Sequence, residues 1–241
     1  MSLAREGLRE MVVATLVLGA GAVVAAWLWH PAAVAPFVIV WAWVISFFRD
    51  PARVARCAAG ELCAPADGTV TEITRLDHDD QIGGPALRLG IFLSIFDVHA
   101  NRSPCAGTVR SVTYRKGTFH DARNARSGPE NEANTLLIDP VAPIRGPIVV
   151  RQVAGLIARR IICHAVAGSE LAIGQRFGMI KFGSRTELIV PDDGAVVPAV
   201  EIGTKVRAGL TILVRQRPLS PDGETDANRR QAQEVASSTP A

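Results

Sequence analysis

The chain has 241 residues, which is enough for one main domain with appendages. Its formal net charge is only +3, and its basic residues form no dense clusters interleaved with aromatic side chains. This composition argues against a nucleic-acid-binding protein and favours an anionic membrane surface as a partner. The four cysteines form no CxxC pair, and no histidine stands at zinc-finger spacing, so no metal site is predicted. These cysteines are interpreted as reduced, mostly buried thiols.

Residues 1–50 predict a membrane anchor. Two uncharged apolar runs cover residues 11–29 and 32–48, with His30-Pro31 between them. As helices they would be about 28 and 25 Å long, slightly shorter than the ~30 Å hydrocarbon core of a bilayer. Two thin spans and a re-entrant hairpin both fit this length. A cleaved signal peptide is the competing interpretation, but the first run is long and lacks a clear small-x-small cleavage signal.

The charges that flank the apolar runs predict their orientation. Arg5 and Arg9 precede the pair, and Arg49, Arg53 and Arg56 follow it. The positive-inside rule therefore places both ends in the cytoplasm, with the rest of the chain on the cytoplasmic face of the cell membrane. All four tryptophans lie in or beside these runs, as interfacial anchors do.

Residues 51–218 are predicted to form a mostly β domain, a compact β barrel or sandwich. Short runs rich in Val, Ile and Thr are punctuated by Gly, Pro and Asp, which leaves no room for long helices. The expected strands are 69–73, 87–93, 108–114, 135–138, 148–153, 161–166, 187–190 and 210–214. Weak similarity between residues 65–70 and 191–196 suggests hairpin elements like those of biotinyl and lipoyl barrels. Residues 219–241 are polar and predict a disordered tail.

The Gly183-Ser184 dipeptide permits a specific reaction. A serine hydroxyl can attack the carbonyl of its own preceding peptide bond when a tight turn holds that bond, and a preceding glycine has no Cβ to obstruct the attack. The dipeptide alone is an ordinary turn sequence. Its significance depends on the residues around it.

Four blocks in the chain occur in a characteristic order. They are Phe47–Pro51, Ala64–Gly68, Phe92–Arg102 and Gly178–Arg185, with a weaker fifth block at Asn131–Asn134. This pattern resembles the phosphatidylserine decarboxylase family, particularly its short form, from the apolar N-terminus to about Val214. The order and spacing of the blocks carry the resemblance more than any single block.

The resemblance implies a self-cleaving enzyme whose catalytic domain spans residues 51–218. Ser184 would attack the Gly183 carbonyl, and elimination and loss of ammonia would leave a covalent pyruvoyl group, so pyruvate made from Ser184 is the implied cofactor. A β chain of residues 1–183 and an α chain of residues 184–241 would remain associated. The pyruvoyl ketone would form a Schiff base with phosphatidylserine and accept electrons as CO₂ leaves, giving phosphatidylethanolamine. A related serine phospholipid is an alternative substrate.

The family blocks also suggest acid–base residues. His99 is the expected proton handler, and Asp67 is the assisting carboxylate. Asp97 is an alternative, because two residues apart on a strand point to the same face. Longer family members carry a second histidine where this chain has Arg102, so the base for self-cleavage stays open and Arg102 could instead bind substrate. Glu132 is a further supporting candidate.

Other interpretations stay open. Arg115, Lys116 and Arg185 are candidates for contact with the lipid head group or the membrane surface. A non-enzymatic membrane adaptor with a lipoyl-like barrel would explain the anchor but not the His99 and Ser184 blocks. A hydrolase that uses Ser184 as an N-terminal nucleophile would keep the serine amino group. No nucleic-acid partner is expected, and the oligomeric state, a homo-oligomer included, is undetermined.

Overall fold

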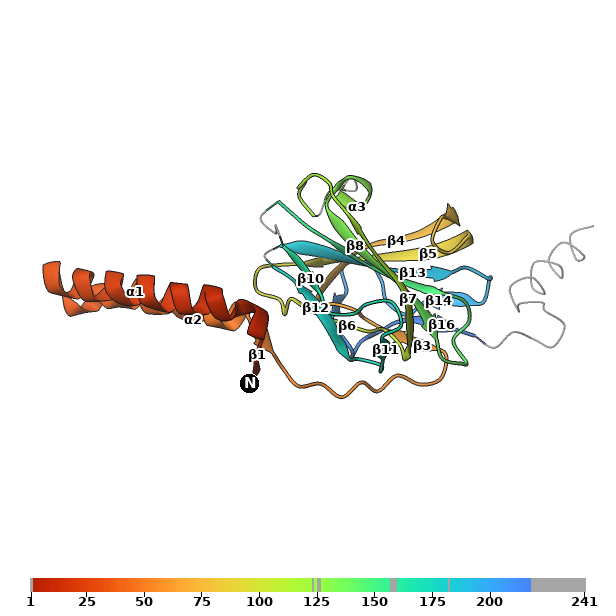
Figure 1. The fold of residues 1–241 in the computed structure, drawn as a ribbon, viewed down its shortest axis with the longest axis horizontal. Coiled ribbons are helices and arrows are strands. Elements are labelled where there is room, and N and C mark those ends of the chain that lie inside the picture. The colour runs from red at the N-terminus through yellow and green to blue at the C-terminus, as the bar shows by residue number, and fades with distance from the viewer. Residues whose placement is uncertain (1, 123, 125–126, 157–159, 182, 218–241) are drawn as a thin grey trace, which may run out of the picture.

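A computed structural model describes residues 2–122, 124, 127–156, 160–181 and 183–217. It shows a helical hairpin that projects from one side of a β domain (Figure 1). The tail predicted over residues 219–241 lies outside the described residues, as does Phe182.

The hairpin consists of α1 (Leu8–Leu28) and α2 (Ala35–Phe47), with the short 3-10 helices Arg5–Gly7 before α1 and Pro31–Val34 before α2. The chain turns at His30-Pro31, where His30 Nδ1 accepts a hydrogen bond from the Ala32 amide. Within the described residues, the helical stretch Arg5–Leu28 is long and apolar enough to cross a membrane, whereas Pro31–Phe47 is shorter. The predicted apolar anchor is thus helical, and its second arm is the shorter one.

Most strands of the β domain join one curled eight-stranded sheet, in the order β11-β7-β8-β9-β13-β5-β4-β15 (Figure 1). Its strands are β4 (Gly68–Asp79), β5 (Gly84–Leu93), β7 (Gly107–Arg115), β8 (Ala133–Pro140), β9 (Ile148–Val153), β11 (Glu170–Leu171), β13 (Ser184–Pro191) and β15 (Lys205–Val206). β13 lies inside the sheet, with antiparallel partners β5 and β9 on its two sides. The mostly β fold class is therefore confirmed.

Smaller sheets complete the domain. One has the order β10-β12-β6 and another β14-β16-β3, and a two-stranded pair joins β1 to β2 at the base of the hairpin. These strands are β1 (Ser2–Leu3), β2 (Arg49–Asp50), β3 (Glu61–Cys63), β6 (Ala100–Arg102), β10 (Ile161–Cys163), β12 (Arg176–Ile180), β14 (Val196–Pro198) and β16 (Ile212–Gln216). A single helical turn, α3 (Ser127–Glu130), lies in the long connection from β7 to β8.

The alternation of apolar residues along the strands fixes which face is the core. On β5, Leu87, Leu89, Ile91 and Leu93 all enter the main hydrophobic cluster. On β13, Leu188 and Val190 do the same. Because alternate residues of a strand share a face, Ser184 and Thr186 lie on the core face of β13, and Arg185 and Glu187 lie on the other.

Two expectations need correction. The structure joins Cys57 to Cys63 in a disulfide, so the interpretation of all four cysteines as reduced is wrong for this pair. The strand expected over residues 187–190 begins earlier, at Ser184, because pairing with β5 extends back to Leu93. A strand therefore starts at the candidate reactive serine itself.

Candidate active site

Two chain connections form a small frame around the candidate cleavage site. The first links β5 to β6, and the second links β12 to β13. Ladder pairs close the frame at both ends, since Ser184 pairs with Leu93 and Met179 pairs with Ala100. The Ile180 amide also donates to the His99 carbonyl at 3.3 Å. Residues 94–99 are thus held opposite Lys181 and Gly183, which brings the His99 and Ser184 blocks together.

Gly183 and Ser184 form the turn that enters β13. Gly183 has φ +58°, in the left-handed region that glycine adopts without a Cβ penalty. Ser184 is fully buried, and its Oγ has no hydrogen-bond partner among the described residues. Gly155 packs so closely that a Cβ there would overlap the Gly183 carbonyl oxygen. The Gly183 carbonyl is therefore tightly enclosed next to a serine hydroxyl that has no hydrogen-bond partner among the described residues.

His99 is buried with one ring nitrogen available. Its Nδ1 lies 2.9 Å from the Asp97 carbonyl oxygen, which can only accept, so Nδ1 carries the proton. Nε2 is buried without a hydrogen-bond partner among the described residues. Burial lowers the pKa of His99 to about 4, and the Phe47 ring lies 4.2 Å from the imidazole, centroid to centroid. The ring is accordingly neutral near pH 7, with Nε2 as a proton acceptor.

Neither candidate carboxylate makes a hydrogen bond to His99. Asp67 forms a two-pronged ion pair with Arg53, at 2.5 and 2.8 Å, and accepts from the Ala208 amide at 2.8 Å. It acts on His99 only through space, where its charge raises the histidine pKa slightly against the effect of burial. Asp67 thus joins the segment before β3, through Arg53, to the turn after β15, through Ala208.

Asp97 orients His99 through its backbone rather than its side chain. Its carboxylate turns back to accept from the Ser94 amide and hydroxyl, at 2.8 and 2.7 Å. The expectation that Asp97 and His99 share a strand face therefore does not hold, because this segment is a turn that precedes β6. The tight turn instead directs the Asp97 carbonyl at the imidazole.

A pocket of about 420 Å³ opens beside Gly183. It is lined by Phe92, Ser94, Ile95, Asp121, Ala122, Leu156 and Gly183. These residues come from β5, the connection after it, the long loop before β8, and the loop after β9. The pocket is mostly apolar and borders the Gly183 carbonyl, so it is suited to an amphipathic molecule that reacts at Ser184.

Comparison with known proteins assigns the chain to a family. The model of the phosphatidylserine decarboxylase family matches residues 40–214. The chain belongs to this family. It is 47% identical over 212 residues to the phosphatidylserine decarboxylase proenzyme of Rhodopirellula baltica, covering 88% of this chain and 87% of that protein. It is 39% identical over 215 residues to the proenzyme of Ralstonia nicotianae, covering 88% and 94%.

Membership of the phosphatidylserine decarboxylase family makes this chain an enzyme, and the adaptor interpretation is set aside. The matched region begins inside α2 and ends in β16, so it includes the base of the hairpin as well as the β domain. The family match therefore covers the whole frame around Ser184.

Two further candidate site residues of this decarboxylase, Arg102 and Glu132, form hydrogen bonds with other parts of the protein. Arg102 donates to Asp50 at 2.6 Å and to the Gly174 and Pro51 carbonyls, each at 3.1 Å. Its guanidinium thus joins the end of the anchor to the β domain. Glu132 lies in the loop before β8, and its carboxylate accepts a hydrogen bond from the Tyr114 hydroxyl. Desolvation, together with the charge of Glu132 and this hydrogen bond, raises the pKa of Tyr114.

A buried amide chain behind Ser184 had no role assigned from sequence. The Asn101 amide donates to Thr186 Oγ1 at 3.1 Å, and the Gln152 amide donates to Asn101 Oδ1 at 2.8 Å. Asn134 in turn donates to Gln152 Oε1 at 3.0 Å. Asn101 and Asn134 lie in the motif blocks, but only the fold shows that they join β6, β8, β9 and β13. This network of amide side chains holds the core-facing Thr186 of β13 in place, two residues after Ser184.

A second polar row lies on the opposite face of β13. Buried Arg185 forms ion pairs with Glu72 and Glu187, and Arg151 donates to Glu187 at 3.0 Å. Gly90 on β5 leaves the space that the Arg185 guanidinium fills. Arg185, a candidate for lipid contact, is instead 3% exposed and enclosed in the sheet. Arg115 and Lys116 are exposed.

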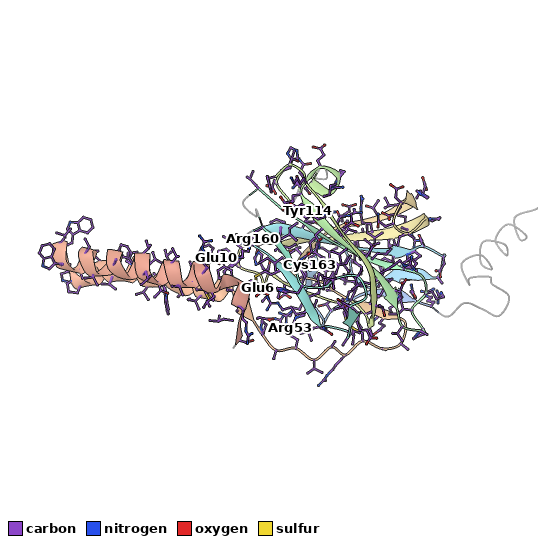
Figure 2. All side chains as sticks on the ribbon, viewed as in Figure 1. Glu6, Glu10, Arg53, Tyr114, Arg160 and Cys163 are labelled. Atoms are coloured by element: carbon purple, nitrogen blue, oxygen red, sulfur yellow. A yellow bond between two sulfur atoms is a disulfide. The ribbon has the colours of Figure 1, made fainter. Side chains whose placement is uncertain are left out.

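The base of the helical hairpin contacts Lys181, which lies two residues before Gly183. Lys181 Nζ donates to Glu10 Oε1 at 2.6 Å and to the Glu6 carbonyl at 2.9 Å. Figure 2 shows Glu6 and Glu10 where the hairpin meets the β domain. Since Phe47 also packs on His99, the anchor forms one wall of the site.

Proposed function

We propose that this chain is a self-processing phosphatidylserine decarboxylase that cleaves its own backbone between Gly183 and Ser184. Ser184 becomes an N-terminal pyruvoyl group, and the processed enzyme converts phosphatidylserine to phosphatidylethanolamine and CO₂. One observation carries the proposal. Ser184 Oγ and His99 Nε2 are both buried without hydrogen-bond partners among the described residues, within one frame of strands.

Self-cleavage uses groups that the chain already holds. Neutral His99 accepts the Ser184 hydroxyl proton at Nε2, and Oγ attacks the Gly183 carbonyl carbon. The C–N bond breaks as an ester forms, which frees the Ser184 amine. Removal of the Ser184 α-proton expels the Gly183 carboxylate and leaves dehydroalanine. Tautomerisation and hydrolysis by one water release ammonia and leave the ketone.

The residues present fit a pyruvoyl group at position 184. The position is buried and lies next to an enclosed carbonyl, and the same frame of strands holds the neutral His99. When formed, the group supplies an electron sink for decarboxylation. His99 holds the proton that is returned to carbon, and the Asn101–Thr186 hydrogen bond keeps the start of β13 in place. The pocket beside Gly183 receives the substrate and limits water.

The strand pairing supports a processed enzyme of two associated chains. β13 would begin the α chain, and both of its sheet neighbours, β5 and β9, belong to the β chain. The buried pairs of Arg185 and Glu187 with Glu72 and Arg151 add cross-chain contacts. We infer that the α chain stays bound. The apolar hairpin and its flanking arginines support a place on the cytoplasmic face of the cell membrane.

Mass spectrometry and denaturing electrophoresis of purified protein test the proposal. Wild type is expected to give two chains, with an α chain of 58 residues (241 − 183) that is lighter than its serine form by one ammonia. Ser184→Ala should stay intact and inactive, whereas the control Ser111→Ala should cleave. His99→Gln should lose self-cleavage, whereas the exposed-histidine control His78→Gln should not. An intact but active wild-type chain, or an α chain that starts with unmodified serine, would contradict the proposal.

A further inference from the structure

Two large apolar side chains stand exposed at the mouth of the pocket beside Gly183. Phe96 is 67% exposed, and Leu156 is 63% exposed. Leu156 lines the pocket, and Phe96 directly follows Ile95, which also lines it. Leaving two large apolar groups in water beside an opening gives up the free energy that their burial would provide. Such a rim usually marks a surface that is covered in the working state.

The rim lies on the side of the β domain from which the anchor projects. Arg49, at the end of the hairpin, donates from Nη2 to the Phe96 carbonyl at 2.5 Å. The loop that begins with Leu156 ends at Arg160, whose charge acts on Glu10 in α1. Figure 2 shows Arg160 and Glu10 close together where the hairpin meets the domain. A bilayer that holds the hairpin would therefore lie next to the rim.

Exposed basic groups lie on the same side of the domain as this apolar rim. Lys205 is 70% exposed, with Nζ 4.0 Å from the Asp97 carboxylate in the same turn as Phe96. The other exposed basic residues near the base of the hairpin are Arg5, Arg9 and Arg160. Each basic group near an anionic bilayer contributes on the order of 1 kcal/mol of attraction. Exposed apolar side chains with cations nearby match the interface of an anionic phospholipid membrane.

We propose that Phe96 and Leu156 insert into the membrane interface and form a lipid-facing entrance through which the substrate passes from the bilayer into the pocket beside Gly183. This inference rests on the proposed function, since it concerns how the phospholipid reaches that site. The hairpin keeps the enzyme on the membrane, and the inserted rim orients the β domain so that its pocket opens toward the lipid.

The first test compares two forms of the substrate. Phe96→Ser, which alters the rim outside the pocket lining, is assayed with phosphatidylserine in vesicles and with a short-chain, water-soluble phosphatidylserine. The control is Val141→Ser, which alters a residue of similar exposure, 61%. Val141 follows the opposite end of β8 from Ala133, which pairs with Val153 near Leu156, so it lies roughly 23 Å farther along the sheet.

Phe96→Ser should lose about tenfold of the wild-type rate on vesicles, because a large inserting side chain is removed. Its rate on the soluble lipid, its self-cleavage and its oligomeric state should match those of wild type and Val141→Ser. Equal rates on vesicles would overturn the proposal. So would a parallel loss on both substrates together with a changed oligomeric state, which would assign the rim to contact with a second copy.

A second measurement does not depend on activity. An environment-sensitive fluorophore on Phe96→Cys should be quenched by brominated lipids in vesicles, whereas the same label on Val141→Cys should not. Labelled wild type gives the background from Cys105 and Cys163, the free cysteines of the structure. Equal quenching at positions 96 and 141 would refute the insertion. If wild type decarboxylates neither substrate, the proposed function fails, and the quenching still decides whether the rim meets lipid.

Discussion

The pKa of His99 provides the most direct test of the site. Burial holds it at about 4, against 6.5 for a histidine in water, and the Phe47 ring covers the imidazole. Phe47→Ala should admit water to that face, so the pKa should rise toward 6.5. The full difference, 6.5 − 4 = 2.5 pKa units, corresponds to about 3.4 kcal/mol at about 1.36 kcal/mol per unit. In Phe47→Ala, the pKa of His99 should rise by part of this difference.

The same pKa predicts how stability depends on pH. Between pH 4 and 6.5 the unfolded chain binds a proton at His99 and the folded chain does not. The contribution of His99 to the free energy of unfolding therefore falls as the pH drops through this window. At pH 5 the loss is about 2 kcal/mol relative to neutral pH, and Phe47→Ala should show a smaller loss.

Histidine ring NMR measures the titration directly. Ser184→Ala keeps the chain uncleaved, and His99→Gln in that background identifies the His99 signals. In the parent, the imidazole should keep its proton on Nδ1 from pH 8 to 5, whereas in Phe47→Ala it should titrate at a higher pH. Phe47→Leu, which retains an apolar cover, should shift less. A midpoint near 6.5 in the parent, or identical titrations in parent and Phe47→Ala, would refute the argument.

Two substitutions test the geometry around the site. Gly155→Ala should slow self-cleavage, measured by pulse-chase electrophoresis, because its Cβ would displace the Gly183 carbonyl, whereas Gly84→Ala has open space and should cleave normally. Wild-type cleavage in Gly155→Ala would show that the carbonyl position does not matter. Arg53→Ala should lower the free energy of unfolding by about 3–5 kcal/mol, measured by chemical denaturation, because it leaves the Asp67 carboxylate buried and unpaired. Arg56 is exposed, so Arg56→Ala should change the free energy of unfolding little. Equal free energies of unfolding for Arg53→Ala and Arg56→Ala would contradict the argument that Asp67 needs its buried partner.

The longer strands could be predicted from sequence because their signal is local. Alternating apolar residues over 87–93 and 148–153 indicate strands whatever the partner, and both strands are present. β6 and β12 were missed, since Asn101, Arg102 and Gly178 carry no strand pattern of their own. Pairing between these two segments makes them strands, and that pairing depends on the whole chain.

The candidate site, like the fold, could be predicted only in part from the sequence. The blocks around His99 and Ser184 indicated the family, because they keep their order and spacing along the chain. The partners of each side chain could not be predicted, since they come from distant segments. Arg185 is enclosed because Gly90, far earlier in the chain, leaves room for it. Asp97 acts through its carbonyl because its carboxylate closes a turn on Ser94.

The sequence by itself determined the family, the mostly β class and the apolar hairpin, because motif order, strand periodicity and uncharged runs are properties of the chain alone. Only the tertiary structure decided how these parts meet. It placed Phe47 of the apolar hairpin against His99 and joined Lys181 to Glu10, so the hairpin helps to build the site. The physical reason is that burial, and with it the pKa of His99, depends on which segments pack around a residue.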